Sequence, residues 1–131
     1  MLERIFGRYQ EYSLMVLRLG VGIIFVGYGA VKLFGGLSDF VSFLEQARVP
    51  FPSIVAPVVA AIEFLGGLAI LVGTGTRIAA LLLSGVMVVA MLTVTLARGF
   101  AGGYDINLAL LGGLLCLLLS GPGKPAVGGD L

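Results

Sequence analysis

Four long apolar runs constrain the fold of this chain more than any other feature of its sequence. They cover about residues 14–34, 54–72, 78–97 and 104–119. A helix that crosses a bilayer needs about 20 predominantly apolar residues. The sequence therefore predicts an all-α membrane protein, a bundle of four transmembrane helices that makes up a single domain over residues 1–131.

Composition supports this class and excludes several others. Hydrophobic residues make up 59% of the chain and charged residues only 11%, too few charges to cover the surface of a soluble domain. The net charge of +1 offers no basic face for nucleic acid. With one Cys and no His, the chain has no internal disulfide, no dithiol and no His-ligated metal, so we expect no metal site and no intrinsic cofactor.

The segments outside the four runs have patterns of their own. Residues 1–13 mix charged and aromatic side chains, as in a short interfacial lead-in. Phe40, Phe43, Leu44 and Ala47 recur at helical spacing, which predicts a short amphipathic interfacial helix between the first and second spans, capped at its start by Ser38–Asp39. We expect this helix to lie as a lid over the mouth of the bundle, and we expect a flexible tail over residues 120–131.

An even number of spans places both termini on one side of the membrane. Five basic residues fall on the terminal side, namely Arg4, Arg8, Arg18, Arg77 and Lys124, and three on the other, namely Lys32, Arg48 and Arg98. Cytoplasmic segments carry the excess of Lys and Arg, so this bias favours cytoplasmic termini.

Glu63 is the residue of the second run that is most costly to place in a membrane, because it lies near the middle of an apolar segment. An acidic side chain at the centre of a transmembrane helix costs roughly 2.5 to 3.5 kcal/mol even on insertion scales. It therefore needs a basic partner, a proton or a water-lined cavity. Two interpretations remain open: a functional site, or a neutral or ion-paired Glu63 that only sets the register of its helix.

The first run contains two bases that could serve as that partner. Arg18 and Lys32 are 14 residues apart, which places them about 40° from each other on one face of a helix. The planar guanidinium of Arg18 can form two parallel hydrogen bonds to a carboxylate. Lys32, in contrast, lies on the same side of the bilayer as the start of the second span. We predict that one of them pairs with Glu63, and the sequence leaves the choice open.

The remaining polar residues are fewer. The third run contains only hydroxyls, among them Thr93 and Thr95, which we expect to bond to their own helix backbone, so we interpret this run as scaffold. In the fourth run, Asp105 falls in the first helical turn, where the helix dipole favours a negative charge, and ordinary capping is the alternative to a role in a site.

Several short motifs, in order along nearly the whole chain, resemble the DoxX family of small bacterial membrane proteins. They are Leu17-Arg18-Leu19-Gly20, Gly27-Tyr28-Gly29-Ala30-Val31-Lys32-Leu33, Glu63-Phe64-Leu65-Gly66-Gly67, Leu71-Val72-Gly73-Thr74-Gly75-Thr76-Arg77 and Gly121-Pro122-Gly123. The resemblance implies a four-helix bundle in the bacterial inner membrane, with Arg18, Lys32, Glu63 and Arg77 as the family's polar positions. Where relatives often have Gly-Gly-x-Glu, this chain has Gly102-Gly103-Tyr104-Asp105.

The resemblance also implies a redox-related function, since some relatives resemble subunits of a thiosulfate:quinone oxidoreductase and others accompany complexes that handle oxidative stress. We expect an accessory or quinone-facing subunit of a membrane oxidoreductase, with quinone as the candidate ligand; whether the chain is itself an enzyme is left open. The candidate binding residues are Arg18, Tyr28, Lys32, Glu63, Arg77, Asp105 and Asn107, with Glu63 as the proton-handling group.

Two alternatives accompany that hypothesis. The first is a non-catalytic scaffold or assembly module. The second is a small-solute or proton pathway, which ranks lowest because four helices leave little room for a lumen. The expected partners are the lipid bilayer, an oxidoreductase subunit and, as a further candidate, a second copy of the chain.

Overall fold

Helices form the regular structure of the part of the chain that the computed structural model describes, residues 1–123. The α-helices are α1 (Leu2–Phe6), α2 (Ser13–Leu33), α3 (Leu37–Gln46), α4 (Pro52–Val72), α5 (Thr76–Ala90) and α6 (Asp105–Ser120). A 3-10 segment, Gly7–Tyr12, joins α1 to α2. A π-helical segment, Met91–Thr95, a 3-10 turn, Leu96–Arg98, and a kinked turn, Phe100–Tyr104, connect α5 to α6; in the kinked turn Ala101 and Gly102 have non-helical backbone angles.

Four helical stretches are long and apolar enough to cross a membrane: Ser13–Leu33, Pro52–Val72, Thr76–Arg98 and Phe100–Ser120. They correspond to the four predicted runs, so the prediction of an all-α membrane protein with four spans is confirmed. The third and fourth spans are composite, because each joins an α-helix to the irregular turns between α5 and α6. Of the predicted tail, Ser120 still belongs to α6, and residues 124–131 lie outside the described residues.

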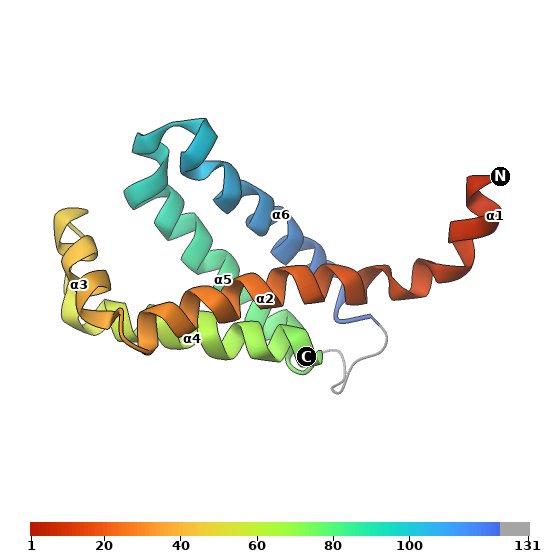
Figure 1. Ribbon diagram of the computed structural model, residues 1–131, viewed down its shortest axis with the longest axis horizontal. Coiled ribbons are helices and arrows are strands. Elements are labelled where there is room, and N and C mark those ends of the chain that lie inside the picture. The colour runs from red at the N-terminus through yellow and green to blue at the C-terminus, as the bar shows by residue number, and fades with distance from the viewer. Residues whose placement is uncertain (124–131) are drawn as a thin grey trace.

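The α2 and α4 helices lie side by side and antiparallel along the length of the molecule (Figure 1). Glycines make this approach possible. A Cβ at Gly29 would be 2.6 Å from the Cα of Phe64, and one at Gly67 would be 2.7 Å from the backbone nitrogen of Val26. Small residues allow membrane helices to gain packing contacts without a hydrophobic driving force. Gly27, in contrast, has open space where its Cβ would be, so it takes no part in this contact.

The α5–α6 hairpin packs against α4 and, less extensively, against α2. In the half of the bundle near the start of α2 and the end of α6, the side chains of Ile70, Leu83, Leu114 and Leu117 are fully buried in one apolar core. Toward the other end the hairpin diverges from the α2–α4 pair, as Figure 1 shows. The bundle is therefore closed at one end and open at the other.

The α3 helix lies at the open end and packs on α4. Its apolar face, predicted from the spacing of Phe40, Phe43 and Leu44, turns toward the bundle, and Leu44 is buried. The predicted cap is wrong, because α3 begins at Leu37 after Gly36, and no side chain caps its start. Ser38 and Asp39 lie inside its first turn, where the carboxylate is still favourably placed in the helix dipole.

The α4 helix also begins earlier than predicted. Phe51 adopts a left-handed backbone conformation, with φ of 53°, and Pro52 opens the helix, where a missing N–H costs nothing. The span thus gains two residues over the predicted start at residue 54.

Candidate functional site

The central feature of the site is an ion pair between α2 and α4. Lys32 Nζ lies 2.6 Å from Glu63 Oε1. Only 1% of Glu63 is exposed, whereas 26% of the Lys32 side chain is. Gly29, one turn before Lys32, contacts the backbone of Phe64, the neighbour of Glu63, and so brings the two helices close enough for the ion pair. Of the two bases that the sequence offered, the structure pairs Lys32 with the carboxylate.

Aromatic rings surround the ammonium group of this pair. Lys32 Nζ lies 4.4 Å from the ring centroid of Phe40, on α3, and 5.7 Å from that of Tyr28, on α2. A cation above the face of an aromatic ring is attracted by the ring quadrupole, more strongly where water is excluded. The α3 helix therefore helps to hold the base of the pair in place.

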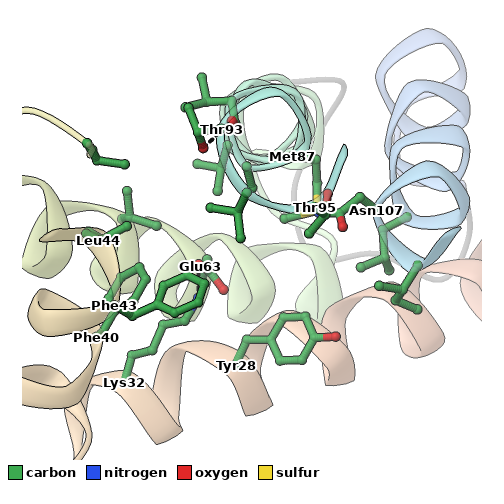
Figure 2. Close-up of a pocket in the computed structure, with 18 of the residues that line it drawn as sticks. Tyr28, Lys32, Phe40, Phe43, Leu44, Glu63, Met87, Thr93, Thr95 and Asn107 are labelled. Atoms are coloured by element: carbon green, nitrogen blue, oxygen red, sulfur yellow. Dashed lines mark hydrogen bonds and ion pairs between the residues drawn. The ribbon is translucent and has the colours of Figure 1, made fainter. Parts of the chain in front are cut away.

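A cavity of about 630 Å³ opens beside the ion pair, in the space where the α5–α6 hairpin diverges from α2 and α4. Figure 2 shows Lys32, Glu63 and Tyr28 on the α2–α4 side, and Met87, Thr95 and Asn107 on the α5–α6 side. The rest of the lining is mainly apolar, from all four spans and from α3, with Thr93 and Arg98 on the hairpin side. We expected four helices to leave little room for a lumen. The cavity occupies only the open end of the bundle, where the hairpin is splayed, and the buried apolar core fills the other half.

Besides Asn107, a candidate from the sequence, the second wall carries Met87 and Thr95, which the sequence did not single out as site residues. Asn107 is buried, 6% exposed, and its Nδ2 donates to Met87 Sδ at 3.6 Å. Thr95 lies in the π-helical segment after α5, and its Oγ1 is buried. Met87 and Thr95 lie in an apolar run whose hydropathy did not indicate a site. The α-helix ends before Thr95, and the apolar pattern continues unchanged past that point. The sequence suggested only a scaffold role for the third run, and the structure places these two of its residues in the cavity lining.

Three polar atoms at this cavity have no hydrogen-bond partner among residues 1–123: Glu63 Oε2, Thr95 Oγ1 and Asn107 Oδ1. Thr93 differs, because its hydroxyl donates to the Val89 carbonyl at 2.7 Å. The expectation that these hydroxyls bond to their own helix thus holds for Thr93 and fails for Thr95. Buried polar groups in proteins are nearly always hydrogen-bonded, so these three atoms call for a water or a ligand group to complete their hydrogen bonding.

The structure brings four of the seven candidate binding residues to the cavity: Tyr28, Lys32, Glu63 and Asn107. Arg18 is buried but does not line the cavity, and at 1.5 Å per residue it lies about 21 Å along α2 from Lys32. Arg77 lies at the opposite end of the bundle, where its Nη2 donates to the Leu119 carbonyl at 3.5 Å. The two arginines thus belong to the closed half of the molecule.

Asp105 is the third residue that the structure keeps away from the cavity lining. Its carboxylate accepts hydrogen bonds from the backbone N–H of Ile106 at 2.8 Å and of Gly102 at 3.3 Å, at the start of α6. This is the ordinary helix-start role that the sequence left open as an alternative.

We therefore expect Asp105→Ala to lower the free energy of unfolding by about 1 kcal/mol, the usual cost of losing a polar group at a helix start. Titration of the detergent-solubilised protein with a denaturing detergent, followed by circular dichroism, measures this change. Ligand binding in the cavity should be unaffected, and a loss of binding in this variant would contradict the assignment.

Four spanning helices with an ion pair at the wall of an intramembrane cavity define a small, multi-pass helical membrane protein. The chain matches the DoxX family model over residues 13–96. It therefore belongs to the DoxX family.

Two relatives cover most of the chain. One is the Bacillus subtilis (strain 168) protein named "Putative oxidoreductase CatD", 34% identical over 111 residues, which are 85% of this chain and 81% of that protein. The other is the Escherichia coli (strain K12) "Inner membrane protein YqjF", 32% identical over 128 residues, which are 92% of each chain. No solved structure matches the chain.

Proposed function

We propose that this protein is an accessory subunit of a membrane-associated oxidoreductase and that its cavity is a quinone-facing site. The observation that carries the proposal is the apolar cavity of about 630 Å³ with the Lys32–Glu63 ion pair on its wall. Ligand sites are typically concave and mostly apolar, with a few polar groups that orient the ligand. The name of the Bacillus relative adds support, because it places an oxidoreductase in the same family.

The chemistry of a quinone matches the residues at this site. Reduction of a quinone to a quinol takes two electrons and two protons. Lys32 keeps N–H donors beyond the one that Glu63 uses, and these are suited to a carbonyl oxygen. Glu63 is the group that would pass protons to the ligand. The sequence has no His and a single Cys, so we assign the electron-transfer centre to a partner subunit that carries a redox cofactor.

We further propose that the protein resides in a bacterial inner membrane with both termini in the cytoplasm. The name of the Escherichia relative supports the membrane, and the five-to-three distribution of basic residues supports the orientation. In this orientation the cavity and α3 belong to the periplasmic half of the bilayer. The buried core around Leu83 and Leu114 closes the other half, which argues against a continuous pathway through one chain.

A quinone titration tests the proposal. Purified protein in detergent is titrated with a short-chain ubiquinone analogue and followed by difference absorbance and equilibrium dialysis. We expect saturable binding to the wild type and about tenfold weaker binding to Glu63→Gln, a loss of roughly 1.4 kcal/mol, because the amide no longer holds the Lys32 ammonium in position.

Glu45→Gln is the matched control, since Glu45 lies on the exposed face of α3 and outside the cavity lining. Equal binding by Glu45→Gln and the wild type is expected. Absence of saturable binding to the wild type would remove the quinone site and favour the scaffold alternative.

A further inference from the structure

Beside the N–H donors of Lys32 and Arg98, the walls of the cavity carry two buried oxygens that only accept hydrogen bonds. Glu63 uses Oε1 for Lys32, and its Oε2 is buried without a partner among the described residues. Asn107 directs Nδ2 toward Met87 Sδ, and its Oδ1 is likewise buried without a partner in that part of the chain. The two residues are 1% and 6% exposed, so bulk water does not readily satisfy these oxygens. A buried acceptor left unsatisfied typically costs about 1 to 3 kcal/mol.

The complement of two acceptors is a ligand with two hydrogen-bond donors. A carboxylate oxygen only accepts, and so does an amide carbonyl oxygen. The Thr95 hydroxyl, on the same wall as Asn107, can donate or accept and is also unpartnered within residues 1–123. A quinone has two carbonyls and no donor, whereas the quinol into which it is reduced has a hydroxyl at each end of the ring.

We propose that the cavity selects the reduced, dihydroxy-aromatic form of its ligand. One hydroxyl donates to Glu63 Oε2, and the hydroxyl across the ring donates to Asn107 Oδ1, with Thr95 beside it. The ring lies among the apolar and aromatic side chains between the walls, with Phe43 on α3 at the open end. This inference rests on the proposed function and adds to it, because it states which redox form the site prefers.

A preference for the reduced form has a measurable consequence. If the site binds the quinol tenfold more tightly than the quinone, the two-electron reduction potential of the bound couple rises by about 30 mV relative to the free couple. The bound quinone then accepts electrons from a partner subunit more readily than the free quinone does.

The test compares three probes of one ring shape by equilibrium dialysis without oxygen: a short-chain ubiquinone analogue, its quinol and the dimethyl ether of that quinol. The ether keeps the ring and loses both donors. We expect the wild type to bind the quinol at least tenfold more tightly than the ether and the quinone.

Two threonines supply a matched pair of variants. Thr95→Val removes an unpartnered hydroxyl from the cavity, whereas Thr93→Val, also at the cavity, removes one that is bonded to Val89. We expect Thr95→Val to weaken quinol binding three- to tenfold and Thr93→Val to leave it unchanged. Asn107→Leu, of similar size, should abolish the preference for quinol over ether.

The outcomes separate the two proposals. Equal affinity for quinol, quinone and ether would overturn the inference and leave the quinone site standing. Identical quinol binding by Thr95→Val, Thr93→Val and Asn107→Leu would also overturn it. If none of the three probes binds, both proposals fail.

Discussion

Replacement of Lys32 by methionine is expected to lower the free energy of unfolding by about 3 to 5 kcal/mol, because it leaves Glu63 as a buried carboxylate without its base. The structure shows why the effect should be large. Glu63 is 1% exposed and bonds to Lys32 at 2.6 Å, so removal of the ammonium leaves the carboxylate buried without a counter-charge. Methionine has a side chain of similar length, so the loss of stability reflects the removed charge rather than a change in packing. Denaturing-detergent titration followed by circular dichroism measures the change.

Two further variants make this result specific. The double variant Lys32→Met/Glu63→Leu should recover most of the lost stability, since a buried ion pair can often be replaced by apolar residues at little cost. Arg98→Met is the control, because Arg98 is an exposed cation that lies 5.4 Å from the ring centroid of Phe43. Its loss should cost under about 1 kcal/mol. A double variant less stable than Lys32→Met alone would contradict the ion-pair explanation.

The second large effect is expected from one added methyl group on α2. Gly29→Ala should destabilise the protein by about 2 to 3 kcal/mol, because the new Cβ meets the backbone of Phe64 and the two helices must separate. Backbone atoms cannot change rotamer to make room. The separation also lengthens the distance between Lys32 and Glu63, so ligand binding should weaken in the same variant. The unfolding titration and the quinone titration together measure both consequences.

Gly27→Ala is the matched control, two residues away on the same helix. A Cβ at Gly27 has open space, so the substitution should be neutral or stabilise by up to about 1 kcal/mol through helix propensity. The two substitutions are chemically identical, and only Gly29→Ala should destabilise the protein. Equal stability of Gly29→Ala and Gly27→Ala would mean that α2 and α4 do not depend on this close contact.

The cavity has one rigid wall and one irregular wall. The α2–α4 pair is held along its length by glycine contacts and by the ion pair. The opposite wall is formed near the hairpin turn, where α5 passes into π-helical and 3-10 segments before α6 begins. Short π-helical insertions in α-helices are frequent at functional sites. The placement of Thr95 in such a segment agrees with a role for this wall in ligand selection.

Much of the fold follows from the sequence alone. Apolar runs of about 20 residues can satisfy their backbone only as helices in lipid, so the four spans and the fold class were predictable without coordinates. The same solvent argument identified Glu63 as unusual and Arg18 or Lys32 as its candidate base, because a carboxylate in an apolar segment is costly wherever the helix lies. The amphipathic spacing of α3 was likewise local information, and its apolar face does turn toward the bundle.

Three features depended on the tertiary structure. The choice of Lys32 over Arg18 required the axial position of α4 against α2, which the contact between Gly29 and Phe64 sets and which no spacing within one helix reveals. The cavity required the divergence of the α5–α6 hairpin, a property of how two pairs of helices cross. The position of Thr95 at the cavity required the π-helical segment after α5, which leaves hydropathy unchanged. Hydrophobicity determines which segments enter the membrane, whereas side-chain packing between helices determines which polar groups meet there.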